Sequence, residues 1–210
     1  LMLQAFRNFL TRRTFAYKAR NKAMNMFSSF ENFKAIRKKA EDSRKDANRP
    51  HEVLYFHKVD DPYSHLTIHF IEKFKSTYDV KFKSILVGEE NPAALHEPSL
   101  YTDYCLEDVK RIAPFYGVDF PGIDYPKKDL VNKANAILSA VSEEEFESIA
   151  KQVSHAIWSD DQEKLNSLGE SYQTSEAEVI EKLKTGNEIR NSCDYYFGSA
   201  FYYEKELYWG

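Results

Sequence analysis

The spacing of apolar positions changes several times along the chain, and each change marks a different predicted element. Residues 53–57 are rich in β-branched and aromatic side chains, which predicts a buried strand. Over residues 62–78 the apolar side chains recur about every 3.6 positions, which predicts a helix with Asp61 as its N-cap and Pro62 at its first position. Residues 80–87 predict a second strand. Together these elements predict a right-handed βαβ unit with two parallel strands.

The stretch that follows has helical spacing almost throughout. Residues 104–116 predict a helix that ends at Gly117, and no proline occurs from Lys127 to Tyr196. The predicted N-caps in this block are Ser142, Ser159 or Asp160, and Ser175, and the predicted helix ends are Gly169 and Gly186. After the block, residues 199–203 and 206–209 predict an aromatic β-hairpin.

The order of these elements predicts an α/β fold in three parts. Residues 1–50 form a basic, amphipathic helical arm. Its last residues are polar and charged and end at Pro50. The βαβ unit and the hairpin form one domain, made of residues 51–95 and 187–210. Residues 96–186 form a helical insert within that domain.

Charge separates the arm from the rest of the chain. The first 50 residues hold 13 Lys and Arg against 4 Asp and Glu, a balance of +9, whereas the remaining 160 hold 16 against 29, a balance of −13. A basic aromatic helix can bind a membrane surface, a nucleic acid or an acidic partner, or can serve in targeting. We favour packing of the arm against the host domain or a second subunit over nucleic-acid or membrane binding.

Composition excludes several classes of protein. The chain is 42% hydrophobic and 30% charged, and its longest apolar runs are far shorter than the roughly 20 residues of a membrane-spanning helix. Two cysteines, Cys105 and Cys193, cannot form a Cys-x-x-Cys pair or a four-cysteine zinc site. We expect both to be small buried hydrophobic residues in a cytoplasmic protein.

Three motifs in order resemble the DsbA-like thioredoxin family, and most closely its branch of 2-hydroxychromene-2-carboxylate isomerase and kappa-class glutathione transferases. They cover about residues 53–210. The motifs are Leu54-Tyr55-Phe56 followed by Asp61-Pro62-Tyr63-Ser64-His65-Leu66, then Tyr101-Thr102-Asp103-Tyr104 with residues 108–118, and finally Phe201-Tyr202-Tyr203-Glu204-Lys205-Glu206-Leu207-Tyr208-Trp209-Gly210. The resemblance implies a thioredoxin-like fold interrupted by the helical insert.

The resemblance also implies where chemistry would occur. In disulfide-exchanging members the turn before the first helix is Cys-Pro-x-Cys, and in the isomerases a serine there binds the glutathione thiolate. Here the corresponding residues are Asp61 and Ser64. A carboxylate repels a thiolate, so we expect standard redox activity to be lost. The position of the family's cis-proline is occupied by Ser199, so Pro62, Ser199 and Ala200 are the predicted ligand-binding residues of a cleft for glutathione or a similar thiol, and we expect the bond before Ser199 to be trans.

The altered turn allows two other kinds of chemistry. Asp61 could act as a general base while Tyr63 or Ser64 orients a substrate, and the alternative is that Asp61 is only the N-cap. His65 and His69 have the i, i+4 spacing of metal ligands, with Asp61 as a third. We favour a chance pairing of the two histidines and expect no metal, because the pair lacks the usual intervening Glu.

The end of the chain affects the expected partners. In the family a final helix follows Trp-Gly and covers the sheet. This sequence stops at Gly210, so we expect that helix to be missing from it. We expect a later segment, a second copy or the arm to cover the sheet instead. Two functions remain open, and the first is the leading prediction. One is an isomerase-like or oxidoreductase-like protein with a thiol-ligand cleft, and the other is a noncatalytic binding or assembly module that uses the arm and the aromatic sheet.

Overall fold

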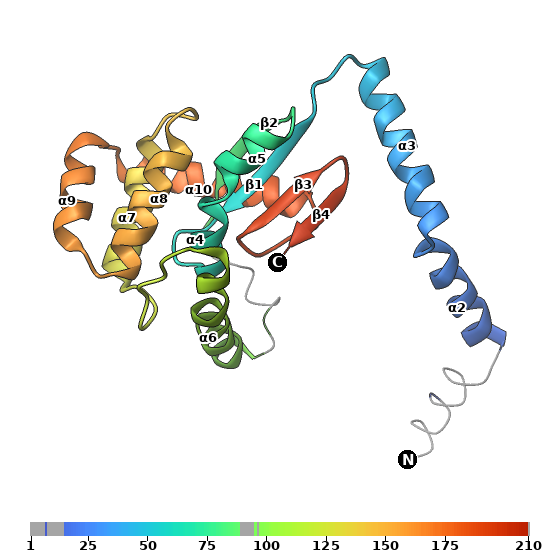
Figure 1. Ribbon diagram of the computed structural model, residues 1–210, viewed down its shortest axis with the longest axis horizontal. Coiled ribbons are helices and arrows are strands. Elements are labelled where there is room, and N and C mark those ends of the chain that lie inside the picture. Colours follow the sequence, from blue (N-terminus) through green and yellow to red (C-terminus); the bar gives the residue numbers. More distant parts are fainter. Residues whose placement is uncertain (1–6, 8–14, 89–94, 96, 210) are drawn as a thin grey trace. The chain divides into compact units, whose positions relative to one another are not determined.

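The computed structural model describes residues 7, 15–88, 95 and 97–209 (Figure 1). The chain divides into two compact units, residues 1–50 and 51–210. The first unit contains helices α2 (Phe15–Phe27) and α3 (Phe30–Asp46). Ser29 separates them and caps α3, because its side chain accepts a hydrogen bond from the backbone N–H of Asn32.

The second unit is an α/β domain built around one four-stranded sheet. Its elements are β1 (Glu52–His57), α4 (Pro62–Ile68), α5 (Ile71–Thr77), β2 (Lys81–Leu86), α6 (Pro98–Tyr116), α7 (Lys128–Ala140), α8 (Phe146–Trp158), α9 (Gln162–Ser171), α10 (Glu176–Ser192), β3 (Ala200–Tyr203) and β4 (Glu206–Trp209). The strand order is β2-β1-β3-β4, with β1 and β2 parallel and the other pairs antiparallel. The predicted parallel βαβ unit and the C-terminal hairpin are both confirmed.

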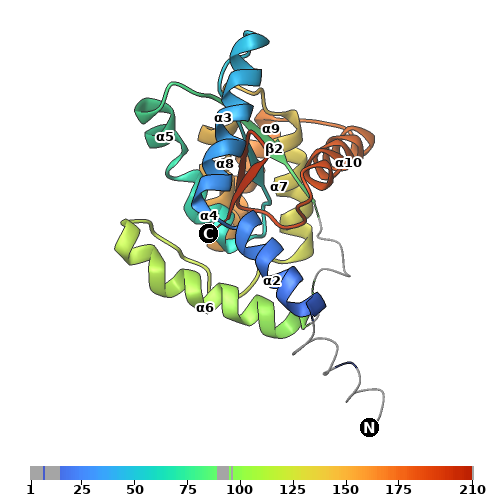
Figure 2. The same cartoon turned by 90° about the vertical axis from the view of Figure 1, so that its right-hand side faces the viewer.

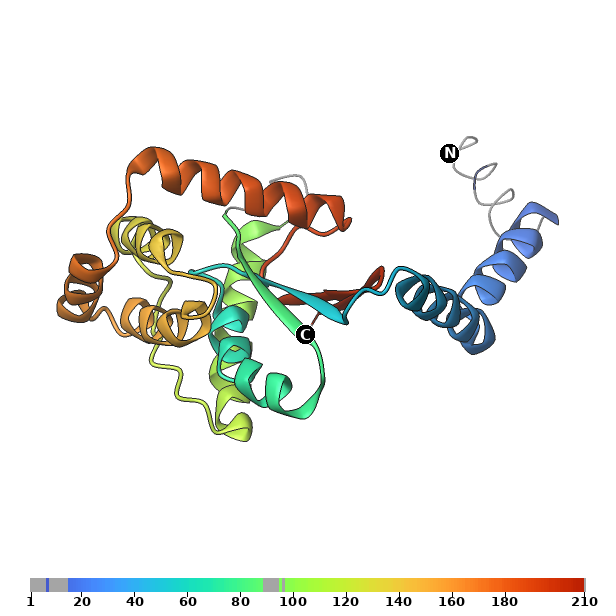
Figure 3. The same cartoon turned by 90° about the horizontal axis from the view of Figure 1, so that it is seen from above.

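Helices cover the two faces of the sheet differently. Helix α10 lies along one face, and α4 and α5 lie on the other (Figures 2 and 3). Under α10 the sheet buries Phe56, Ile85 and Ala200. On the opposite face Tyr55 and Leu86 join the larger core, which continues into the bundle of α7, α8 and α9. Residues of β1 and β3 therefore alternate between two separate hydrophobic layers.

The helix predicted over residues 62–78 is broken in two, which corrects that prediction. Helix α4 ends at Ile68, and the backbone N–H of His69 bonds to the carbonyl of Leu66 rather than to that of His65. The carbonyl of His65 instead receives the Nδ1 of the His69 side chain at 2.7 Å. A side chain thus replaces one backbone hydrogen bond, and the chain makes a tighter turn before α5 begins.

Gly186 does not end α10, contrary to the prediction; the helix continues to Ser192. A Cβ atom at this position would lie 1.9 Å from the carbonyl oxygen of Leu86 on β2. The glycine therefore serves a close approach of the helix to the strand. Gly169 likewise lies within α9 rather than after it.

The caps of the helical block agree with the predictions only in part. Ser175 caps α10 through a capping box with Glu178, as predicted. The N-cap of α9 is Asp161, one residue beyond the predicted alternatives. The sequence predicts Ser142 as an N-cap, but the N-cap of α8 is Glu145, three residues later. The Ser142 hydroxyl donates a hydrogen bond to the Glu145 carboxylate and accepts one from the Glu145 backbone N–H. Helix α6 begins at Pro98, well before the predicted start, and ends at Gly117 as expected.

Among the helices that the structure describes, none combines the length and the apolar character that crossing a bilayer requires.

Candidate functional site

The turn between β1 and α4 places Asp61 at the N-terminus of the helix. Its carboxylate accepts hydrogen bonds from the backbone N–H of Ser64 at 2.8 Å and from the Ser64 hydroxyl at 2.7 Å. Pro62 occupies the first helical position. The prediction that Asp61 is an N-cap is confirmed. The negative charge that the end of the helix favours is therefore supplied by the chain itself.

Ser64 is enclosed by this turn. Its side chain is completely buried, and its Oγ also accepts a hydrogen bond from the backbone N–H of Lys58 at 3.3 Å. Its backbone carbonyl accepts from the Tyr55 hydroxyl at 3.3 Å. With all of these contacts made inside the protein, the Ser64 hydroxyl is not exposed to a substrate.

A small cavity of about 50 Å³ lies beside Asp61 and Pro62. Phe197 lines this cavity together with two rings on which it stacks, Tyr101 at 5.2 Å and Trp209 at 6.1 Å between centroids. Pockets that bind small organic ligands usually enclose about 300–1,000 Å³. This cavity therefore has room for water-sized molecules and not for a tripeptide.

Gly198 brings a loop directly against the turn. A Cβ atom there would lie 2.8 Å from the Cβ of Lys58, 3.0 Å from a carboxylate oxygen of Asp61 and 3.1 Å from the Ser64 Oγ. Only a glycine permits this approach without displacing a neighbour. Gly198 is not among the predicted site residues, although a lone glycine inside the aromatic run 195–203 is an available signal.

The predicted ligand-binding residues next to this glycine are buried instead of lining the cavity. The Ser199 hydroxyl is hydrogen-bonded to that of Thr67 at 2.7 Å, and Ala200 is completely buried. Ser199 has a φ of +51°, and every peptide bond of the described residues is trans. Of the three predicted ligand-binding residues, only Pro62 faces the cavity.

Cys105 of α6 is brought to the same cavity. Burial raises the pKa of its thiol, and the nearby negative charge of Asp61 raises it further, although a hydrogen bond with Tyr101 acts in the opposite direction. The thiol is therefore held in its protonated, unreactive form. In the sequence Cys105 is an isolated residue. Its place beside the cavity depends on how α6 packs, which the sequence alone does not show.

Tyr63 is directed toward α6 rather than toward the carboxylate of Asp61. Its hydroxyl donates a hydrogen bond to Asp108 at 2.7 Å. Burial and this hydrogen bond raise the pKa of the Tyr63 phenol. Of the two residues proposed to orient a substrate for Asp61, the structure thus brings Ser64 into contact with the carboxylate and engages Tyr63 elsewhere.

The His65 and His69 pair is arranged for hydrogen bonding rather than for metal binding. His65 is completely buried and contacts the Ser154 hydroxyl through Nδ1 at 2.8 Å and the Asp119 carbonyl through Nε2 at 2.7 Å. Its burial lowers the pKa of the imidazole to about 4. Across the described part of the chain, no three His, Cys, Asp or Glu side chains gather as a metal site.

A second buried histidine, His57, lies at the end of β1. Its Nδ1 is 3.0 Å from the Tyr55 hydroxyl, and its Nε2 has no hydrogen-bond partner among the described residues. Burial lowers the pKa of His57 to about 3. Its burial agrees with the buried strand predicted over residues 53–57, whereas the sequence gives no sign that its Nε2 lacks a hydrogen-bond partner.

Comparisons with known proteins identify the fold. Neither the models of protein families nor the curated proteins that were compared match the sequence. Two solved structures are similar to 76% of this chain and to 88% of their own chains. One is a 2-hydroxychromene-2-carboxylate isomerase, with a TM-score of 0.55 and 16% identity, and the other is a candidate protein disulfide isomerase from Nitrosomonas europaea, with a TM-score of 0.56 and 14% identity.

The shared fold is the DsbA-like thioredoxin fold. This confirms the predicted fold class: a thioredoxin-like βαβ unit and hairpin, with a helical block between them.

Proposed function

We propose that this protein is a noncatalytic binding and assembly module with a DsbA-like thioredoxin fold, and that it binds through the aromatic face of its sheet. The observation that carries the proposal is a contrast between two places in the second unit. The position of thiol chemistry in this fold is filled by the Asp61 carboxylate, whereas a large aromatic groove on the sheet is open.

The Asp61 turn supports the first half of this contrast. A thiolate placed at the end of α4 would meet a carboxylate that already accepts two hydrogen bonds from Ser64. The negative charges of the thiolate and of the Asp61 carboxylate would repel each other. The adjoining cavity of about 50 Å³ also leaves little room for a ligand. Cys105, the thiol nearest to this turn, is buried with a raised pKa. These features oppose thiol-disulfide exchange here.

The open groove supports the second half. It has a volume of about 730 Å³ and lies on the sheet face opposite α10. We call it the sheet groove; its walls include Val53, Phe74, Tyr78, Phe82, Phe201, Tyr203 and Tyr208. Soluble proteins rarely leave a contiguous apolar patch of this kind uncovered unless it binds a partner.

A thiol-ligand cleft is the second candidate. It is favoured by the similarity in fold to a 2-hydroxychromene-2-carboxylate isomerase and by the polar residues gathered near the end of α4. Glutathione would then bind near Asp61 and Pro62 after Phe197 moves aside. We also place the protein in the cytoplasm, a location that agrees with two free cysteines, Cys105 and Cys193.

Thermal unfolding separates the two candidates. The full chain and its Asp61→Ser variant are each melted at two protein concentrations, with and without glutathione. An assembly module is stabilised by a higher protein concentration, because association favours the folded state, and is insensitive to glutathione. Stabilisation of the wild type by glutathione would contradict our proposal and favour the ligand cleft. Stabilisation of Asp61→Ser alone would indicate a cleft that the carboxylate has closed.

A further inference from the structure

We infer that the sheet groove receives the aromatic helices α2 and α3 of a second copy of this chain. The inference rests on the proposed function, since it names the partner that the assembly module binds. It is carried by the shape of the groove, the exposed apolar residues of the helices, the charges of the two units and the hydrogen bonds that close the end of α3.

Two adjoining hollows make up the proposed docking surface. The sheet groove of about 730 Å³ shares Phe74, Tyr78 and Phe201 with a neighbouring hollow of about 430 Å³ between α4, α5 and α6. The walls of the second hollow are also largely apolar, and include Ile112 and Tyr116 of α6. Two adjoining hollows with aromatic walls are a surface on which the apolar residues of an amphipathic helix can bind.

The proposed occupant has the complementary property. Helix α3 has no buried residue along its whole length, all of which the structure describes. Exposed large apolar side chains recur along α2 and α3, namely Met24, Met26, Phe27, Phe30, Phe33 and Ile36. Isolated helices of this length are marginal in water, so most of their stability must come from packing these apolar residues against another surface.

The overall charges of the two units favour the same pairing. The first 50 residues have a balance of +9, and the other 160 have a balance of −13. At the proposed surface itself, Asp79 lies at the wall of the sheet groove and Lys73 at the wall of the neighbouring hollow. The polar positions of α3 include Lys34, Lys38 and Lys39, so basic side chains flank its aromatic residues. Opposite charge on the two partners accelerates their encounter and disfavours pairing of like with like.

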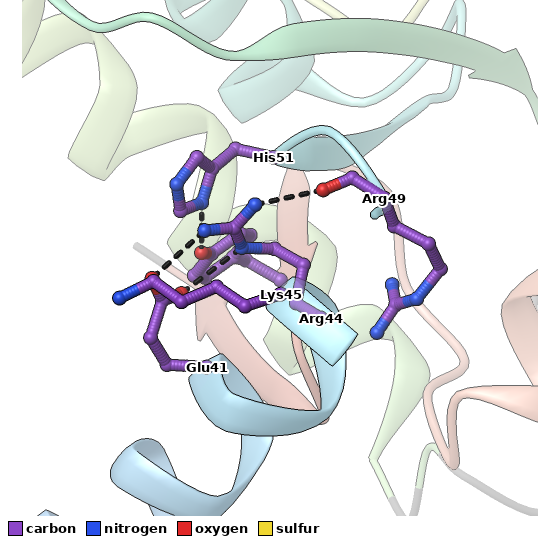
Figure 4. A network of polar contacts seen from close by, with 6 residues as sticks. Glu41, Arg44, Lys45, Arg49 and His51 are labelled. Carbon is purple, nitrogen blue, oxygen red and sulfur yellow. Dashed lines mark hydrogen bonds and ion pairs between the residues drawn. The ribbon is translucent and has the colours of Figure 1, made fainter. Parts of the chain in front are cut away.

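Hydrogen bonds close the C-terminal end of α3, next to the junction of the two units (Figure 4). The backbone N–H of Arg49 bonds to the Arg44 carbonyl at 3.0 Å, and the Arg44 guanidinium donates to the Arg49 carbonyl at 2.7 Å. Arg44 is itself held by Glu41 at 2.8 Å. These hydrogen bonds hold residues 47–49 against the end of α3. Only Pro50 then separates them from His51, which lines the sheet groove. A short, hydrogen-bonded hinge favours exchange of an element between copies.

Sedimentation velocity of the full chain tests this inference with three variants. Phe30→Ser/Phe33→Ser removes aromatic rings from the arm, and Tyr78→Ser removes a 57% exposed ring from the groove. Phe115→Ser removes an 89% exposed ring of α6 that lines neither hollow and is the matched control. Circular dichroism establishes that each variant is folded.

We expect the wild type and Phe115→Ser to dimerise over the same range of protein concentration. The arm variant and Tyr78→Ser should each need a protein concentration roughly tenfold or more higher to remain dimeric. An equimolar mixture of the arm variant and the Tyr78→Ser variant should form a heterodimer, because one arm and one groove remain intact between them. This recovery cannot arise from misfolding of either variant.

Three results would overturn the inference, and they have different consequences for the proposed function. A wild type that remains monomeric at all concentrations shows that the second copy is not the partner. Loss of association in Tyr78→Ser with full association in the arm variant shows that the groove binds something other than the arm, and the proposed function survives. Association that neither variant weakens contradicts both proposals.

Discussion

At the scale of single residues, the chemistry of this fold depends on what occupies the N-terminus of α4. Unpaired backbone N–H groups at the end of a helix favour a negative charge, whether it is a thiolate or a carboxylate. In this chain the Asp61 carboxylate occupies this position and accepts hydrogen bonds from the Ser64 backbone N–H and hydroxyl at 2.8 and 2.7 Å. The same electrostatic preference that can activate a thiol is here satisfied by a structural contact.

Replacement of Asp61 should therefore affect stability. Asp61→Ala removes both hydrogen bonds to Ser64 and should lower the free energy of unfolding by about 1 kcal/mol, within the range of about 0.5–2 kcal/mol for lost N-caps. Asp61→Asn keeps an acceptor at the cap and should lose much less. Urea denaturation at neutral pH measures both values. An Ala variant as stable as the wild type would show that the cap contributes nothing.

The two buried histidines predict instability in acid. Their pKa values are lowered to about 3 for His57 and about 4 for His65, mainly by burial. An unfolded chain takes up protons near pH 6.5, so between about pH 6.5 and 4 the unfolded state binds more protons and stability falls as the pH falls. Each histidine should remove up to about 1.4 kcal/mol for each pH unit below 6.5.

This loss is measured by urea unfolding at pH 7.5 and pH 5.0 for the wild type and for His65→Gln. The variant has no imidazole to protonate at this position, so its stability should fall less between the two pH values. An equal fall in both proteins would show that His65 does not cause the acid sensitivity.

The sequence identified Asp61 as a cap because that role depends on neighbouring residues alone. Cys105 and His57 could not be placed in the same way. The first is brought to the turn by the packing of α6, and the second contacts Phe146 of α8. Such long-range contacts leave no local pattern in a single sequence.

At the scale of elements, glycine illustrates how a local signal can be misinterpreted. Gly169 and Gly186 both predict a helix end, yet both lie inside helices. At Gly186 the reason is the contact of α10 with the Leu86 carbonyl. At Gly169 a Cβ would meet only the Cε of Lys133, at 3.9 Å. Nothing in the sequence separates these two environments.

The two glycines provide a matched pair of substitutions. Gly186→Ala places a Cβ against backbone and should destabilise the protein by about 1–3 kcal/mol or more, because α10 must move away from β2. Gly169→Ala has room and should stabilise by about 0.5–1 kcal/mol through helix propensity. Thermal or urea unfolding gives both signs. A neutral Gly186→Ala variant would show that α10 approaches β2 less closely than the structure indicates.

At the scale of the whole molecule, the order of elements was predictable while the openness of the sheet groove was not. The β-branched and aromatic side chains of residues 53–57 and 199–203 predict strands. Successive side chains of a strand point to opposite faces of its sheet. Which of those faces α10 covers depends on tertiary packing, which leaves Phe201 and Tyr203 beside the groove and places Ala200 in the core.

Amide hydrogen exchange tests the central claim, that this protein works through the sheet groove and not through the Asp61 turn. The full chain is measured at low and high protein concentration, and at low concentration with saturating glutathione. We predict that raising the protein concentration slows exchange in α5 and the β3–β4 hairpin, whereas glutathione leaves residues 58–66 unchanged. Protection of residues 58–66 by glutathione, with exchange around the groove independent of protein concentration, would contradict the account.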